Sequence, residues 1–258
     1  MVPAGDSRQR IQREARGRWD PGGGGPLPDG RVRPPDRRQH GGDGPRTRGT
    51  RGGAPGLSGE AALRVPVHYD FASTICYVAH RVMERMAPTL QELAIELDWI
   101  PVDLTQITGY GRGAAMPELR RDNARRIGAE LGVEVEPPPI WLDSRLLGAA
   151  ALIARSRGRD AGWRERVWTA LFEERREPPD LEGTVFMARD LALVLAPAEF
   201  EDASIDLDAL TLAAVEAQVT GVPTFMLGRW PFGGIQSEET MTHVLERYAR
   251  RARAGELS

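Results

Sequence analysis

The order in which hydrophobic periodicity changes along the chain is the feature that most constrains its fold. Alternating apolar residues predict a strand over residues 65–71, and apolar residues at helical spacing follow as far as Leu97. A second strand is predicted over residues 98–104, but the next strand pattern appears only at residues 222–227. A last amphipathic helix follows near residues 237–251. This order predicts an α/β protein whose sheet is assembled from two distant parts of the chain.

The segment between the two groups of strands reads as consecutive amphipathic helices. Apolar residues recur there at spacings of three and four, and arginines and acids occupy the intervening faces. The predicted helices run near Glu118–Leu131, Ser144–Arg157, Gly162–Arg175, Leu181–Leu195 and Asp206–Thr220. The layout is therefore βαβ, a helical region, and then ββα.

The first 60 residues differ in composition from the rest of the chain. They contain 12 arginines and 15 of the 29 glycines, and they are poor in branched apolar residues. Such a segment cannot bury enough apolar surface to offset its ordering entropy, so we predict a disordered extension over residues 1–63. Its Arg-Gly elements suggest contact with nucleic acid, but Trp19 is its only aromatic residue for base stacking. A GC-rich gene explains the composition more simply, and nucleic acid is an unlikely partner.

The cysteine and histidine content excludes several kinds of chemistry. Cys76 is the only cysteine, so the chain has no intramolecular disulfide, no Cys-x-x-Cys pair and no multi-thiolate zinc site. The four histidines are far apart in sequence, and nothing argues for a metal. No apolar stretch is long enough to span a bilayer or to serve as a secretory signal. We therefore expect no membrane partner and a reducing, cytoplasmic location.

Two short motifs carry the candidate chemistry. Ser73-Thr74-Ile75-Cys76 follows the first strand and starts the first helix, and Gly221-Val222-Pro223-Thr224 starts the second group of strands. Over roughly residues 65–250 this arrangement resembles the DsbA family, which includes 2-hydroxychromene-2-carboxylate isomerases and kappa-class glutathione transferases. The resemblance implies a thioredoxin-like domain over 64–104 and 221–252, with a helical insertion domain over 105–220.

In DsbA-type oxidoreductases the first motif is Cys-x-x-Cys, whereas this chain has Ser73 at the first position and Cys76 at the resolving position. The isomerase and transferase branch has serine first, where it holds the sulfur of glutathione. Thr74 departs from the proline that is common in relatives. A helix N-terminus favours an anion, and it lowers the pKa of a cysteine there. We name Ser73 and Cys76 as candidate catalytic residues, with a capping role for Ser73 and an inert, buried role for Cys76 left open.

The second motif implies a ligand-binding loop. In the family its proline follows a cis bond and faces the active-site helix, which leaves the backbone of the preceding residue free to pair with a peptide. Val222 and Pro223 are therefore candidate ligand-binding residues. Gln236 and Ser237 precede the last helix, where glutathione-using relatives bind the γ-glutamyl end, although a plain helix cap is the simpler interpretation. His80 lies one turn after Cys76, and a solvated histidine is the default there.

These motifs predict a DsbA-family protein that binds or acts on a low-molecular-weight thiol, with glutathione as the model cofactor. One alternative is a glutathione-dependent isomerase or transferase proper. Another is a peptide-binding module that keeps the groove without the chemistry. A dithiol cycle is disfavoured, because exchange stops at a mixed disulfide without a second reactive thiol. Homodimerisation is left open.

Overall fold

The computed structural model of the chain describes residues 62–256. The extension expected over residues 1–63 lies outside this part, apart from its last two positions. The sheet has four strands in the order β2-β1-β3-β4. They are β1 (Leu63–Tyr69), β2 (Ile95–Pro101), β3 (Thr224–Leu227) and β4 (Trp230–Gly233).

The sheet joins the two distant parts of the chain, as the periodicity predicts. β1 and β2 are parallel, with Val67 opposite Trp99, and β3 pairs antiparallel to β1, with Phe225 opposite Val67. β4 returns antiparallel along β3 after a tight turn. The pairing of β1 with β3 places the end of β1 beside the start of β3, next to the site described below.

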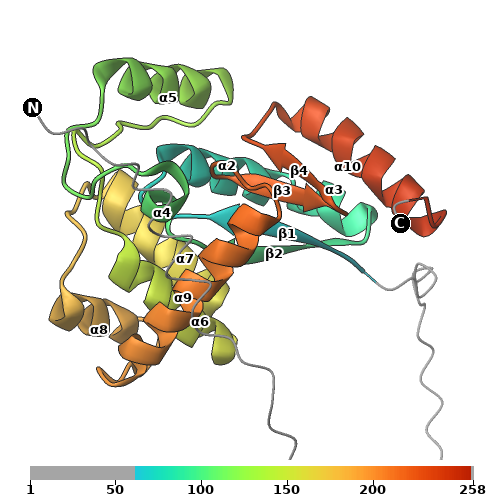
Figure 1. Cartoon of the computed structure of the whole chain (residues 1–258). Coiled ribbons are helices and arrows are strands. Elements are labelled where there is room, and N and C mark those ends of the chain that lie inside the picture. Colours follow the sequence, from blue (N-terminus) through green and yellow to red (C-terminus); the bar gives the residue numbers. More distant parts are fainter. Residues whose placement is uncertain (1–61, 257–258) are drawn as a thin grey trace, which may run out of the picture. The chain divides into compact units, whose positions relative to one another are not determined.

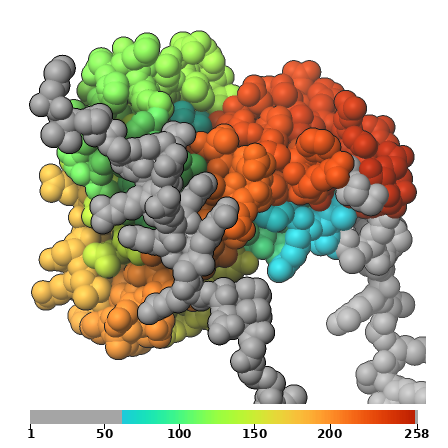
Figure 2. Space-filling view, in the orientation of Figure 1, coloured from blue at the N-terminus to red at the C-terminus, as the bar shows by residue number. Residues whose placement is uncertain are grey.

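Helices α2 and α3 connect β1 to β2, and α10 follows β4. The other helices form the long connection between β2 and β3. Figure 1 shows α6, α7, α8 and α9 gathered together, with α5 apart from them at the top and α10 beside β3 and β4. In Figure 2 the α5 segment (green) forms a lobe beside the orange and red surface of the β3–α10 part. The bounds are α2 Thr74–Arg85, α3 Ala87–Glu92, α4 Leu104–Thr108, α5 Glu118–Glu130, α6 Arg145–Ser156, α7 Asp160–Trp168, the π-helical turn η1 Thr169–Glu173, α8 Leu181–Arg189, α9 Glu199–Glu216 and α10 Glu238–Arg253.

Several element boundaries differ from those predicted. The helical pattern extends to Leu97 in the sequence, yet α3 ends at Glu92 and β2 begins at Ile95, because Ala94 turns the chain with a φ of 45°. Short apolar runs fit both periods, so the strand was predicted three residues late. α8 ends at Arg189 rather than Leu195, and α9 begins at Glu199, seven residues before the predicted start.

A cluster of aromatic side chains packs the sheet against the helical region. The Trp168 ring of α7 lies 5.4 Å from the ring of Tyr69 and 5.8 Å from that of Trp99, and Trp168 and Tyr69 are at most 1% exposed. Phe71 completes the contact on Trp168 at 5.4 Å. Large buried rings dominate core energetics. The helical region is therefore joined to the strands by a shared core, and its division into a separate domain stays a prediction.

Within residues 62–256, no helix is both long enough and apolar enough to span a membrane.

Candidate functional site

A pocket of about 320 Å³ lies where the N-terminus of α2 meets the loop before β3. Its size is at the lower end of the range for small-molecule sites. Its walls come from four segments that are far apart in sequence. They are formed by Ala72, Ser73, Thr74, Ile75, Leu104, Thr108, Tyr110, Met116, Arg120, Ala124, Trp141, Thr220, Gly221 and Val222. The pocket therefore brings together Ser73 and Val222, the two main residues that the sequence motifs predict.

Ser73 is the N-cap residue of α2. Its backbone is extended (φ −91°, ψ 110°), and its hydroxyl oxygen accepts a hydrogen bond from the Cys76 N–H at 3.2 Å. The first-turn N–H groups of a helix lack intrahelical acceptors and carry a partial positive charge, so they favour an anion. Thr74, 5% exposed, also lines the pocket, and its hydroxyl has no hydrogen-bond partner among the described residues. This turn therefore has unused capacity to hydrogen-bond a ligand.

Cys76 lies one turn into α2 and faces the core. Its side chain has no exposed surface, and it is not among the residues that line the pocket. Burial raises the pKa of the thiol to about 12, although a hydrogen bond with Ser73 acts in the opposite direction. The thiolate is the reactive form of cysteine, so burial and the raised pKa both disfavour a nucleophilic role for Cys76.

The loop before β3 presents an unpaired stretch of backbone to the pocket. The Val222–Pro223 peptide bond is cis. The Val222 N–H and C=O have no hydrogen-bond partner within the described part of the chain. The flanking groups are used, because Thr224 Oγ1 donates to the Gly221 carbonyl at 2.7 Å and Gly234 N–H donates to the Pro223 carbonyl at 2.8 Å. Val222 therefore offers one donor and one acceptor to an extended ligand.

An aromatic pair and an arginine form a wall of the pocket that the sequence motifs did not predict. The rings of Tyr110 and Trp141 are stacked, with centroids 4.2 Å apart and planes 12° from parallel. The guanidinium of Arg120 lies over the Tyr110 ring at 4.7 Å. For the Gly-rich segment around Tyr110 the sequence predicts a flexible lid over the cleft or a plain loop. No local pattern indicates that this loop meets residue 141.

Gln236 and Ser237 lie away from this pocket wall. Both are exposed and neither is among the lining residues. Ser237 is the N-cap of α10, and its hydroxyl accepts a hydrogen bond from the Thr240 N–H at 3.3 Å. The structure therefore shows a capping role for Ser237, and ligand binding by these two residues stays a prediction.

A buried aspartate at the end of β1 holds three segments around the pocket. Asp70 accepts hydrogen bonds from the N–H of Ala72 at 2.7 Å, the N–H of Leu104 at 2.6 Å and the hydroxyl of Ser144 at 2.5 Å. Burial raises the pKa of Asp70, and these hydrogen bonds act in the opposite direction. The carboxylate thus ties the loop before α2 to the starts of α4 and α6.

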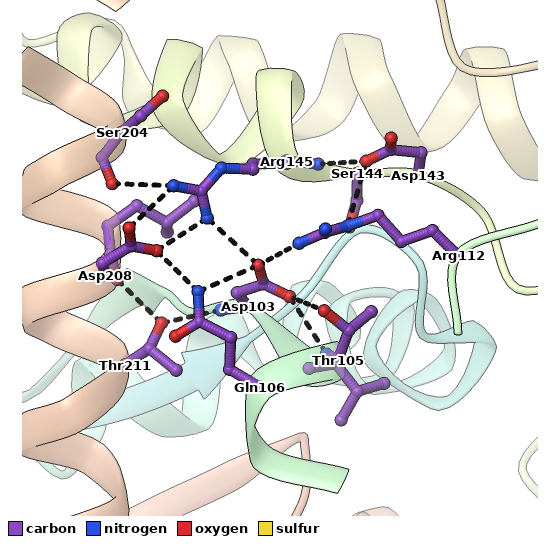
Figure 3. A network of polar contacts seen from close by, with 12 residues as sticks. Asp103, Thr105, Gln106, Arg112, Asp143, Ser144, Arg145, Ser204, Asp208 and Thr211 are labelled. Atoms are coloured by element: carbon purple, nitrogen blue, oxygen red, sulfur yellow. Dashed lines mark hydrogen bonds and ion pairs between the residues drawn. The ribbon is translucent and has the colours of Figure 1, made fainter. Parts of the chain in front are cut away.

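A second buried aspartate organises the neighbouring polar network shown in Figure 3. Asp103 is 4% exposed, caps α4 through the N–H of Thr105, and pairs with the guanidinium groups of Arg112 and Arg145. Arg145 also pairs with Asp208 of α9 at 2.6 Å. This network fixes the segment that carries Tyr110 against α6 and α9.

Three groups with metal-ligating atoms meet between α2 and α7. His80 Nε2 lies 2.9 Å from Glu165 Oε2 and 3.4 Å from Glu84 Oε1. Arg81 already supplies a positive charge there, because its Nη1 lies 2.8 Å from Glu165 Oε2 and 2.7 Å from Glu84 Oε2. His80 is also buried rather than solvated, which lowers its pKa, and its ring packs on Trp168 at 4.6 Å. The cluster therefore acts as a structural ion-pair network.

The four-stranded sheet, with α2 after its first strand and α10 after its last, defines a protein of thioredoxin-like fold. The family profile described as DSBA-like thioredoxin domain matches residues 64–246. The chain belongs to the DSBA-like thioredoxin domain family. No match was found among curated proteins.

Solved structures show the same fold. A structure described as a probable DsbA oxidoreductase from Streptomyces coelicolor is 21% identical, has a TM-score of 0.57, and aligns over 72% of this chain and 89% of its own. A 2-hydroxychromene-2-carboxylate isomerase is 21% identical, with a TM-score of 0.56 and coverage of 76% and 100%. The cytosolic disulfide reductase DsbM from Pseudomonas aeruginosa, solved with GSH, is 18% identical, with a TM-score of 0.51 and coverage of 75% and 98%.

Proposed function

We propose that this protein binds a low-molecular-weight thiol, such as glutathione, in the pocket between α2 and the Val222–Pro223 loop. The observation that carries the proposal is Val222, which lines the same pocket as Ser73 and whose backbone N–H and C=O are unpaired within residues 62–256. A peptide-like thiol pairs with such groups as an added strand does. The GSH in the DsbM structure supports this choice of ligand.

In this proposal Ser73 holds and activates the sulfur of the ligand. Its oxygen accepts the Cys76 N–H, and in this proposal its rotatable O–H turns from the Cys76 sulfur to donate to the thiolate of the ligand. The positive end of α2 also favours the thiolate over the thiol. The sulfur then acts as a nucleophile while Ser73 keeps it in place.

The burial of Cys76 bears on which reaction follows. A dithiol cycle requires a second thiolate to resolve the mixed disulfide, and Cys76 has neither exposure nor acidity. This favours an isomerase- or transferase-type use of the thiol as the second candidate, and the isomerase that aligns over its whole length supports it. A single buried cysteine also suits a reducing, cytoplasmic location, which remains part of the proposal.

Substitution of Ser73 tests the proposal. We expect Ser73→Ala to weaken glutathione binding about three- to thirtyfold, because one hydrogen bond to a charged sulfur is lost. Loss of the cap should also cost about 1 kcal/mol of stability. Titration calorimetry measures the affinity and thermal unfolding measures the stability.

Asp180→Ala provides a matched control for the loss of a helix cap. Asp180 caps α8 by accepting from the Gly183 N–H at 2.8 Å, and it does not line this pocket. It should lose a similar amount of stability and keep full affinity. Equal affinity in Ser73→Ala and the unaltered protein would contradict the role of Ser73. A protein that binds no thiol at millimolar concentration would instead be a module without thiol chemistry.

A further inference from the structure

The charge on the pocket wall is positive. Arg120 is the only Arg, Lys, Asp or Glu among the lining residues, and the α2 N-terminus adds a partial positive charge. No carboxylate of the lining faces a ligand to offset these two charges. The wall is therefore complementary to an anion at two separate places, the helix N-terminus and Arg120.

The guanidinium of Arg120 differs from those of its neighbours on α5. Arg121 pairs with Glu118 and Glu136, Arg125 pairs with the same two glutamates, and Arg126 pairs with Glu130 at 3.5 Å. Arg120 has no acidic partner within residues 62–256. The only described interactions of its guanidinium within this range are with rings, at 4.7 Å from the Tyr110 centroid and 5.9 Å from the Trp141 centroid.

The contacts of Arg120 with the rings leave its N–H donors available to a ligand. None of the N–H donors of the Arg120 guanidinium has a hydrogen-bond partner within residues 62–256. Those donors match a carboxylate in a planar, two-bond geometry. Because the rings restrict the side chain before a ligand arrives, less conformational entropy is lost on binding.

The ring pair under Arg120 is held by backbone pairing between two loops. Gly113 N–H donates to the Trp141 carbonyl at 2.8 Å, and Trp141 N–H donates to the Ala114 carbonyl at 2.9 Å. Met116 N–H donates to the Pro139 carbonyl at 2.8 Å, and residues 115 and 140 form an isolated antiparallel bridge. Backbone hydrogen bonds between the two loops therefore support the ring pair.

We propose that Arg120 on its Tyr110–Trp141 platform binds a carboxylate of the ligand, so that the site selects thiols that also carry a carboxylate. This inference rests on the proposed thiol-binding function and adds the second point of recognition. The α2 N-terminus receives the sulfur and Arg120 receives the acid. Neutral thiols lack the second contact and should bind weakly.

A comparison of three ligands with two variants separates the sulfur contact from the carboxylate contact. The ligands are glutathione, its sulfur-free analogue γ-glutamyl-α-aminobutyryl-glycine, and the neutral thiol 2-mercaptoethanol. Arg120→Gln keeps a planar side chain and removes the charge. Arg126→Gln is the matched control, because Arg126 is an exposed arginine on the same helix with only an i,i+4 partner.

We expect Arg120→Gln to bind both glutathione and the sulfur-free analogue about ten- to a hundredfold more weakly, with 2-mercaptoethanol binding unchanged. Arg126→Gln should match the unaltered protein. Raising the ionic strength should weaken glutathione binding to the unaltered protein more than to Arg120→Gln, because Arg120 lies at a solvent-exposed position. Thermal unfolding verifies that both variants fold.

The outcomes distinguish this inference from the proposed function. Equal glutathione affinity in Arg120→Gln and the unaltered protein would overturn the carboxylate contact, and a loss in Ser73→Ala would still support the thiol site. Binding of the sulfur-free analogue that depends on Arg120, with equal affinity for glutathione, would support the carboxylate contact and contradict the role of the sulfur. No measurable binding of any of the three ligands would contradict both.

Discussion

Ser73 and Cys76 lie three residues apart at the start of α2, and they are 7% and 0% exposed. Ser73 lines the pocket, whereas Cys76 is fully buried in the core. Ser73 is the residue at which the helix begins, whereas Cys76, one turn later, belongs to the hydrophobic core. In this family the same spacing commonly holds two cysteines, and here it holds a candidate ligand contact and a packing residue.

The thiol of Cys76 should be unreactive in the native protein. Burial raises its pKa to about 12, so almost no thiolate exists at neutral pH and reagents have no access to the sulfur. We expect negligible alkylation by iodoacetamide in native buffer and complete alkylation in denaturant, both measured by mass spectrometry. Rapid labelling of the folded protein would show that the turn opens and would reinstate Cys76 as a catalytic candidate.

At the residue scale, the sequence predicted the capping position of Ser73 and the placement of Val222, because both lie within local motifs. Arg120 was not predicted. Neighbouring arginines on α5 look equivalent in the sequence, and only the fold shows that one of them lies on a ring pair rather than beside a glutamate.

At the scale of elements, α2 and α7 are joined by charges as well as by rings. Glu165 of α7 accepts hydrogen bonds from Arg81 Nη1 at 2.8 Å and pairs with His80 Nε2 at 2.9 Å. Burial acts to raise the pKa of Glu165, but the bonds from Arg81 and His80 outweigh it and hold the pKa at about 2. Burial lowers the pKa of His80, and Arg81 supplies a positive charge beside the same carboxylate.

This contact between Glu165, Arg81 and His80 should make the stability of the protein depend on pH in the acidic range. The folded pKa of Glu165 lies below its ordinary value of 4.5, so its contribution is complete above that value and is lost as the pH falls towards 2. We expect the unaltered protein to lose more stability than Glu165→Gln over this interval. Because the side chain is 44% exposed, solvent screening should keep the difference modest. Denaturant unfolding at a series of pH values measures it.

Glu92→Gln is the control for this pH dependence. Glu92 is an exposed carboxylate at the end of α3, without an ion-pair partner in the described part of the chain. Its variant should follow the unaltered protein over the whole pH range. If the stability of Glu165→Gln and of the unaltered protein changed in parallel with pH, the contact between Glu165, Arg81 and His80 would contribute nothing to stability in acid.

The types and order of the main elements were predictable, because each depends on a repeat of apolar residues within a short window. Some boundaries were not. Residues 93–97 fit a helical period and a strand equally well, and the pairing of Leu97 with Val65 across the sheet decides for the strand. Strand pairing thus decided between two local patterns that the sequence left equal.

At the scale of the whole molecule, the network around Asp103 connects the end of the sheet to α4, α6 and α9 (Figure 3). The Asp103 N–H donates to Thr211 Oγ1 of α9 at 2.9 Å, while its carboxylate pairs with Arg112 and Arg145. These contacts span more than a hundred residues of sequence. They hold the loop that carries Tyr110 in position beside the pocket.

Two substitutions of Asp103 separate its charge from its cap. Asp103→Asn keeps a good N-cap and removes the ion pairs, so we expect a loss of about 1–3 kcal/mol in the free energy of unfolding. Asp103→Ala also removes the cap and should lose about 1 kcal/mol more. Chemical denaturation measures both. If Asp103→Asn were as stable as the unaltered protein, the ion pairs of Asp103 would only compensate for the cost of burying its charge.

The sequence by itself determined the classes and order of the elements, the N-cap at Ser73, the absence of a second cysteine and the family resemblance. All of these depend on residue identity or on short-range spacing. The tertiary structure decided that Cys76 is buried, that the Val222 backbone is unpaired, and that Tyr110, Arg120 and Trp141 meet at one wall. Those features depend on which distant segments pack together. That packing is set by the combined burial and hydrogen bonding of the whole fold, which no local pattern contains.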